Sequence, residues 1–227
     1  QLFMKLNVAQ EIKKVLLRLE KIGRERQNFQ LDAHAIDSGA SSTRPSMSRN
    51  TGFIVAESDV VGRDDDKDRM INLLLSEESD RQGDVSVAPI IGMGGVGKTT
   101  LAQLVYNDER VKSHFEFRMW VCVTDVFNYT KVLKDMIEYH TEIKYNDISS
   151  LSNVQLESRL LELLKGKPYL LILDDVWPES FDWSDLQKLL KHGGKGSRVV
   201  VTSRSSHVAN LMGTLPPHFL ELLPEDQ

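Results

Sequence analysis

The chain has 227 residues, of which 41% are hydrophobic and 27% are charged, a composition typical of a globular protein. This length allows one large domain, or one domain with smaller attachments. The net charge is −5, from 28 basic and 33 acidic residues, which argues against a protein that binds nucleic acid through a general excess of basic residues.

Cysteine content and hydropathy narrow the class of protein further. Cys122 is the single cysteine of the sequence, which excludes an internal disulfide framework and fits a reducing compartment, so we expect a cytoplasmic protein. No apolar run of the sequence approaches the ~18 residues of a membrane span, and no signal peptide is visible. The chain starts at Gln1 and ends in mid-pattern, so we expect it to be a fragment of a longer protein.

Residues 4–30 are predicted to form an amphipathic helix. Their apolar residues recur at alternating spacings of four and three, as in a coiled-coil seam. This seam consists of Val8, Ile12, Val15, Leu19 and Ile22. It covers only about two heptads, fewer than the roughly three to four that indicate a coiled coil, so we favour a helix that docks on a neighbouring surface. We assign 1–30 to this attachment and 31–58, which is rich in Ser, Thr, Arg, Gly and Asn, to a linker.

The remaining residues, 59–227, have the pattern of an α/β domain. A helix is expected after Asp64–Asp66, since acids favour a helix N-terminus. Apolar runs predict strands at 85–91, 117–123, 169–174 and 198–202. Helical periodicity separates or follows these runs at 98–108, 129–140, 152–165, 182–190 and 205–212. Strands that alternate with helices predict a mostly parallel sheet that is buried on both faces.

The segment 92–99, GMGGVGKT, fits the phosphate-binding pattern G-x-x-x-x-G-K-[ST] at every required position. Glycines let the backbone turn so that several N–H groups point at a phosphate, and the helix that follows adds its own unpaired N–H groups. We expect phosphate binding from Gly92, Gly94, Gly95, Val96, Gly97, Lys98, Thr99 and Thr100. Lys98 would reach the β- and γ-phosphates, and the Thr99 hydroxyl would bind Mg²⁺. A glycine-rich turn can also be purely structural, but the apolar run before this loop and the helical spacing after it favour the phosphate loop.

Two adjacent acids, Asp174 and Asp175, end the apolar run at 169–173. A phosphate loop needs a neighbouring strand that ends in an acid for the metal, and Asp174 is predicted to orient Mg²⁺, through water. Asp175 would then polarise the water that attacks ATP. The alternative, that this pair only caps the next helix, is less favoured.

The strand predicted at 198–202 leads into Arg204, at the sheet end where ligands collect. An arginine at this place can bind a terminal phosphate through two N–H groups. The alternative is a solvated Arg204. Arg198, at the other end of the strand, is predicted to be structural.

Together these segments resemble the NB-ARC domain of plant intracellular immune receptors, the nucleotide-binding leucine-rich-repeat family. Within that family the sequence is similar to the class with an N-terminal coiled-coil domain. The resemblance rests on Val61-Gly62-Arg63, on GMGGVGKTT, on FRMWVCV at 117–123, on LLILDDVW, on GSRVVVTSR and on HFLELL at 218–223.

The resemblance implies a molecular switch that holds ADP at rest and ATP when active, with slow Mg²⁺-dependent hydrolysis and an oligomer on activation. Catalytic roles would fall to Asp175, Lys98 and Arg204, and Arg204 would sense the phosphate. Val61, Gly62 and Arg63 would lie by the adenine and ribose. Trp120 and Trp177 are expected to be packing residues.

The resemblance also implies neighbours for this domain. Segment 1–30 would be the last helix of the coiled-coil domain, and the partners would be that domain, the rest of the NB-ARC unit and the leucine-rich repeats. The sequence stops before the family's GLPL and MHD motifs, so 59–227 would be the nucleotide-binding subdomain alone. Its expected architecture is a five-stranded parallel sheet flanked by helices, with the strand before Arg204 between the strand before the phosphate loop and the LILDDVW strand.

Two other functions remain open at this stage. A fast-turnover ATPase is less favoured because Asp175 is one methylene shorter than a glutamate and would position a water less well. A protein-interaction scaffold that needs no nucleotide is less favoured because the phosphate loop is complete.

Overall fold

The computed structural model describes residues 52–55, 58, 60–76, 85–123, 127–138, 148–177 and 183–223. All of them fall within one unit, Met47–Gln227. The helix predicted at 4–30 and most of the predicted linker lie outside the described residues. Among the helices that the structure describes, none combines the length and the apolarity needed to cross a membrane.

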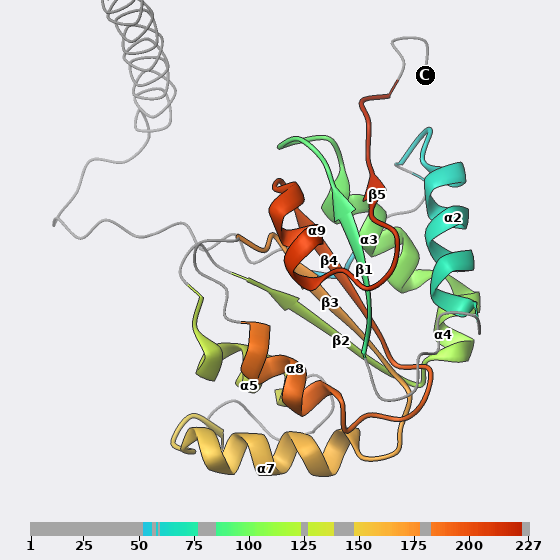
Figure 1. Ribbon diagram of the computed structural model, residues 1–227. Coiled ribbons are helices and arrows are strands. Elements are labelled where there is room, and N and C mark those ends of the chain that lie inside the picture. The colour runs from blue at the N-terminus through green and yellow to red at the C-terminus, as the bar shows by residue number, and fades with distance from the viewer. Residues whose placement is uncertain are drawn as a thin grey trace, which may run out of the picture. The chain divides into compact units, whose positions relative to one another are not determined.

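A five-stranded parallel sheet forms the centre of this unit (Figure 1). Its strands are β1 (Ser86–Ile91), β2 (Phe117–Cys122), β3 (Tyr169–Asp174), β4 (Arg198–Ser203) and β5 (His218–Phe219). The spatial order is β2-β3-β4-β1-β5, so β4 lies between β1 and β3 as predicted. The predicted α/β fold with a five-stranded parallel sheet is therefore confirmed.

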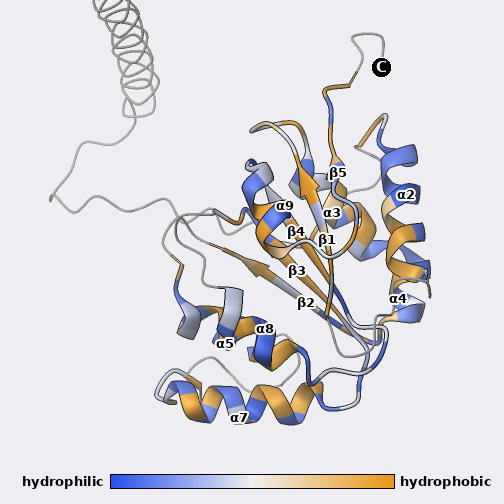
Figure 2. Cartoon of the chain, in the orientation of Figure 1, coloured by the Kyte–Doolittle hydropathy of each residue, from blue (hydrophilic) through white to orange (hydrophobic). Residues whose placement is uncertain are grey.

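Successive side chains of the central strands enter different cores, because a strand points alternate residues to opposite faces. Leu170 and Ile172 belong to one apolar cluster, whereas Leu171 and Leu173 belong to the other. Every residue of β3 is buried. Because the sheet is covered on both faces, its strands are apolar along their length, and the helices have one apolar and one polar side (Figure 2).

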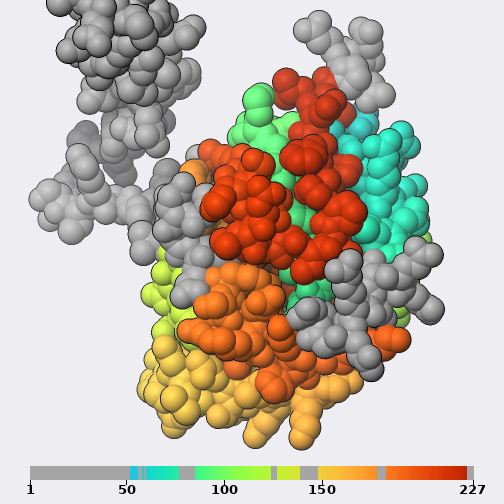
Figure 3. Space-filling view, in the orientation of Figure 1, coloured from blue at the N-terminus to red at the C-terminus, as the bar shows by residue number. Residues whose placement is uncertain are grey.

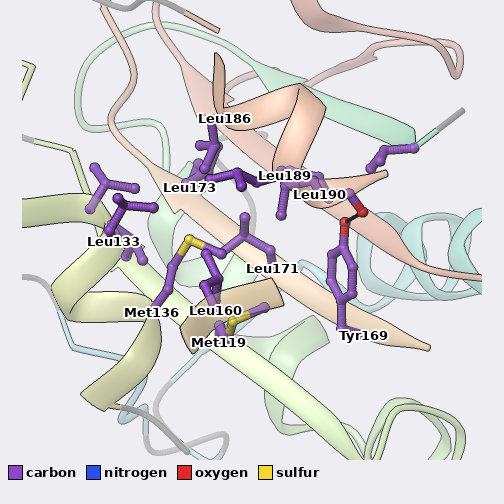
Figure 4. Packing of buried hydrophobic residues seen from close by; sticks show 14 of the residues in the cluster. Met119, Leu133, Met136, Leu160, Tyr169, Leu171, Leu173, Leu186, Leu189 and Leu190 are labelled. Carbon is purple, nitrogen blue, oxygen red and sulfur yellow. Dashed lines mark hydrogen bonds between the residues drawn. The ribbon is translucent and has the colours of Figure 1, made fainter. Parts of the chain in front are cut away.

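Helices cover both faces of the sheet. One face packs against α2 (Asp64–Leu75), α3 (Lys98–Asn107) and α4 (Glu109–His114). The other packs against α5 (Tyr129–Glu138), α7 (Asn153–Leu164), α8 (Trp183–Leu190) and α9 (Ser206–Met212). On this second face Leu171 lies among Met136, Leu160 and Leu189, which come from three different helices (Figure 4).

Two elements were not located from the sequence. Helix α4 follows α3 directly, because Asp108 leaves the helical conformation at ψ 137° and its side chain accepts a hydrogen bond from the Arg110 N–H at 2.9 Å. Such an N-cap starts a new helix where periodicity alone suggested the end of one. Strand β5 has two residues, paired with Ile90 and Ile91 of β1, too few to show a period.

Arg198, at the start of β4, ties α2 to the sheet. Its side chain is 3% exposed, and its guanidinium donates to the carbonyl oxygens of Leu74 (3.1 Å) and Ser76 (2.9 Å). The last carbonyls of a helix have no partner within the helix, so a buried arginine that binds them completes the α2 C-terminus. These contacts are structural, as the sequence predicts for Arg198.

Replacing Arg198 should therefore destabilise the fold. We expect Arg198→Ala to lower the free energy of unfolding by about 2–4 kcal/mol, because it leaves buried carbonyl groups unpaired. Urea denaturation measures this loss. The matched control is Arg69→Ala, an exposed arginine on α2, for which we expect a change within about 0.5 kcal/mol. Equal effects of the two variants would contradict the capping role.

Candidate functional site

The predicted phosphate loop connects β1 to α3 at the carboxyl end of the sheet. Its shape depends on glycine at two positions in particular. Gly97 has φ 99°, a left-handed conformation that side chains disfavour. A Cβ on Gly92 would come within 2.7 Å of the Leu220 carbonyl oxygen, so the segment after β5 passes directly over the start of the loop.

A cavity of about 240 Å³ opens between this loop and the ends of the strands. The residues that line it come from the loop, from α3 and from the last residues of β2, β3 and β4. They are Gly94, Gly95, Gly97, Lys98, Thr99, Thr100, Cys122, Asp174, Asp175, Thr202 and Arg204. The structure thus brings the predicted phosphate, metal and hydrolysis residues to one cavity, apart from Gly92 and Val96.

Lys98 is held inside the loop that it is predicted to serve. Its side chain is 7% exposed, and Nζ donates a hydrogen bond to the Met93 carbonyl oxygen at 2.8 Å. Burial lowers the pKa of the Lys98 ammonium, and the positive charge of Arg204 lowers it further, while Asp175 and Asp174 act in the opposite direction. An anion in this cavity would favour the charged form of Lys98.

Asp174 is fully buried at the end of β3 and is held by two hydroxyl groups. The Thr99 hydroxyl lies 2.9 Å from its Oδ1 and 3.1 Å from its Oδ2, and the Thr202 hydroxyl donates to Oδ1 at 2.6 Å. A buried carboxylate needs such donors, since burial of an unpaired charge is costly. The contacts join α3, β3 and β4 at one point.

These residues fit a magnesium ion. The part of the chain that the structure describes contains no group of three His, Cys, Asp or Glu side chains arranged to hold a metal. Mg²⁺ does not need one, because it prefers oxygen ligands and keeps several of its waters beside phosphate. Thr99 and Asp174, already in contact, offer a hydroxyl and a carboxylate of that kind.

Asp175 has an unusual backbone conformation. Its φ is 56°, a region that residues other than glycine seldom adopt and that often marks a functional position. Its N–H donates to the Thr202 hydroxyl at 2.9 Å, which fixes the turn. The carboxylate Oδ1 lies 3.7 Å from the Arg204 Nε. The Asp175 side chain is 30% exposed and lines the cavity.

Arg204 lies between Asp175 and the phosphate loop. A Cβ on Gly94 would be 3.3 Å from its Nη1, so the guanidinium sits directly against the loop. Its Cζ also lies 5.2 Å from the centre of the Trp177 ring, a cation–π distance.

Sequence reasoning missed two features of this site. Trp177 was expected to be a packing residue, but its contact with Arg204, the predicted phosphate sensor, was not foreseen. Trp120, at 2% exposed and edge-on to Tyr106, does pack in the core. Thr202 was also missed as a partner of both acids, although its position at the end of a strand beside β3 was a usable signal.

The predicted adenine and ribose residues lie outside the lining of the cavity. Val61 is 65% exposed, and Gly62 has φ 76°. The Arg63 side chain is 8% exposed and donates hydrogen bonds to oxygen atoms of Asp66, Val96 and Glu221. The nucleotide contacts of these three residues stay a prediction.

The order of the strands, the glycine loop that opens into a helix with Lys98 and Thr99, and the acid at the end of β3 define a P-loop NTPase fold. Comparison with known families gives the particular group. The NB-ARC domain model matches residues 63–227, so the chain belongs to the NB-ARC family, and the predicted resemblance is confirmed.

Relatives with this domain include plant proteins. The disease resistance protein RGA2 of Solanum bulbocastanum is 39% identical over 221 residues, which cover 96% of this chain and 22% of that protein. The disease resistance protein RPM1 of Arabidopsis thaliana is 34% identical over 199 residues, 85% of this chain and 21% of that protein. The chain spans about a fifth of the length of these curated relatives.

Proposed function

We propose that the chain is the ADP/ATP-binding switch domain of a plant intracellular immune receptor, with slow Mg²⁺-dependent ATP hydrolysis. The observation that carries the proposal is the complete phosphate loop, with Lys98 and Thr99 beside the buried Asp174. Membership of the NB-ARC family and the disease resistance relatives support the same assignment.

Phosphate binding would rest on the loop N–H groups and on Lys98. The Lys98 ammonium already lies within the loop, where it donates to the Met93 carbonyl oxygen. A phosphate oxygen is a stronger acceptor for the ammonium than a neutral carbonyl oxygen, because its negative charge also attracts the positive charge of Lys98. We therefore expect Lys98 to exchange this contact for the β- and γ-phosphates.

Thr99 and Asp174 would hold the metal, Thr99 directly and Asp174 through water. Mg²⁺, when bound, neutralises charge on the β- and γ-phosphate oxygens. Thr202 would keep the Asp174 carboxylate oriented, because it donates to Oδ1 from the neighbouring strand at 2.6 Å.

Slow hydrolysis would depend on Asp175. Its carboxylate is exposed to the cavity, which suits a group that polarises a water. However, the carboxylate Oδ1 is paired with the Arg204 Nε at 3.7 Å, and an aspartate side chain is shorter than that of a glutamate. Both features favour a switch that resets slowly over a fast-turnover ATPase.

Other parts of the domain would contact the nucleoside and the surrounding protein. Val61, Gly62 and Arg63 would contact adenine and ribose, and Arg204 would read the terminal phosphate. The partners would be a coiled-coil domain, the remaining NB-ARC subdomains and leucine-rich repeats. The receptor would be cytoplasmic and would form an oligomer on activation.

Removing the Lys98 ammonium tests the binding function. We expect Lys98→Ala to weaken ATP and ADP binding at least about 100-fold, because several charge-assisted hydrogen bonds to the phosphates are lost. Isothermal titration of the purified chain measures the affinity. Lys112→Ala, which removes an exposed lysine paired with Glu109, is the control and should bind like the unmodified chain. Unchanged affinity in Lys98→Ala would contradict the assignment and favour a scaffold that needs no nucleotide.

Asp175 is best tested by Asp175→Asn, since asparagine tolerates φ 56° better than alanine while it removes the charge. We expect single-turnover ATP hydrolysis to slow by about 100-fold, the size of a general-base effect. The affinity for ATP should stay within about threefold. If hydrolysis and affinity fell by the same factor, Asp175 would be a binding residue instead.

Arg204 is tested by the ratio of two affinities. We expect Arg204→Ala to weaken ATP binding by about tenfold, because a charge-assisted contact to the γ-phosphate is lost, and to leave ADP binding within about twofold. Competition titrations with the two nucleotides give the ratio. A preserved ATP-to-ADP ratio would remove the sensing role.

A further inference from the structure

The buried guanidinium of Arg63 joins three segments that are far apart in the sequence. Nη2 donates to the Val96 carbonyl oxygen of the phosphate loop at 2.9 Å and to the Glu221 carbonyl oxygen, after β5, at 2.8 Å. Nη1 donates to Asp66 Oδ2, in the first turn of α2, at 3.0 Å. These contacts use both N–H groups of Nη2, so this nitrogen is fully occupied by the protein.

Asp66 and His218 extend this cluster to the sheet. His218 Nε2 lies 2.9 Å from Asp66 Oδ1, while Arg63 occupies the other oxygen of the same carboxylate. His218 belongs to β5 and pairs with Ile90 of β1, two residues before the phosphate loop. The His218 side chain is 13% exposed and the Asp66 side chain is 19% exposed. Figures 1 and 3 show β5 and the segment after it next to α2.

The contact with Val96 has a direct consequence for the phosphate loop. A trans peptide is planar, and its C=O and N–H point in opposite directions. The Val96 carbonyl and the Gly97 N–H belong to one peptide unit. An Arg63 side chain that holds the carbonyl therefore fixes the direction of the Gly97 N–H. Gly97 lines the cavity, whereas Arg63 is not among the lining residues, and its Nε lies 4.0 Å from where a Gly97 Cβ would be.

We propose that Arg63, Asp66 and His218 are positioning residues, which hold the phosphate loop in its binding shape and link it to the segment after β5. The proposal rests on the proposed nucleotide binding and adds its regulation. Residues 218–221 supply two of the contacts, so a movement of this segment would release Arg63 and loosen the Val96–Gly97 peptide. Nucleotide affinity would then depend on the conformation of the chain that follows β5.

Substitutions of His218 separate positioning from packing. Glutamine can place an N–H donor where Nε2 lies, whereas alanine cannot. We expect His218→Ala to weaken ADP binding about fivefold, mainly through faster dissociation, and His218→Gln to stay within about twofold. Stopped-flow dissociation of a fluorescent ADP analogue measures both. Normal binding by His218→Ala, or an equal loss in His218→Gln, would overturn the proposal.

A double-mutant cycle tests whether the residues act as one unit. Asp66→Asn and His218→Ala should each weaken ADP binding, and the double variant should lose clearly less than the product of the two factors. Independent, multiplying effects would overturn the shared role. The control is Lys188→Ala, which breaks a pair of similar length, 2.7 Å to Asp185, on the exposed side of α8 and should leave ADP binding unchanged.

Hydrogen exchange of the loop distinguishes a failure of this proposal from a failure of nucleotide binding itself. Without nucleotide, we expect amides 92–97 to exchange faster in His218→Ala than in the unmodified chain, and at the unmodified rate in His218→Gln. If the unmodified chain bound no ADP, the proposed function would be wrong. The exchange rates of amides 92–97 in the two proteins would still test the positioning role. Equal exchange in His218→Ala and the unmodified chain would overturn it.

Discussion

The buried carboxylate of Asp174 is the constraint around which the site is organised. A fully buried charge must be matched by donors, and here the donors are the hydroxyls of Thr99 and Thr202. Because they come from α3 and β4, satisfying the charge fixes the helix after the phosphate loop against two strands. The Thr202 hydroxyl also accepts a hydrogen bond from the Asp175 N–H. The same hydroxyl therefore holds the turn from which the Asp175 side chain lines the cavity. The proposed metal site and the proposed water-polarising site would thus be built from one polar cluster.

The charged side chains around this cluster are balanced in number. Lys98 and Arg204 are the cations and Asp174 and Asp175 the anions of one cavity. A nucleotide phosphate would add negative charge to this cavity, and a metal ion would offset part of that charge. This balance explains why nucleotide and Mg²⁺ would be expected to bind together. Arg204 itself pairs loosely with Asp175, at 3.7 Å, and lies over the Trp177 ring at 5.2 Å.

The parts that could be predicted from the sequence are those with local signals. Gly92–Thr99 is a contiguous pattern, and β3 and β4 are continuous apolar runs that must be buried on both faces, which places Asp174 and Arg204 at the same edge. The parts that could not be predicted depend on contacts distant in sequence or on single residues. The α3–α4 break depends on one cap, Asp108, and β5 depends on pairing with β1. Two of the three partners of Arg63 lie 33 and 158 residues away, beyond the reach of any local pattern.

The Arg63 cluster gives the fold a route between the nucleotide and the chain after β5. Coupling of this kind is reciprocal: if the arrangement of residues 218–221 strengthens ADP binding by some factor, then ADP stabilises that arrangement by the same factor. The segment also crosses Gly92 so closely that a side chain there would clash with the Leu220 carbonyl. Two independent contacts, at Gly92 and at Val96, therefore make the phosphate loop and this segment parts of one packed unit, in which a displacement of either requires the other to move. The proposed switch would therefore not need a separate transmission element, because the predicted phosphate loop is already in contact with the segment after β5.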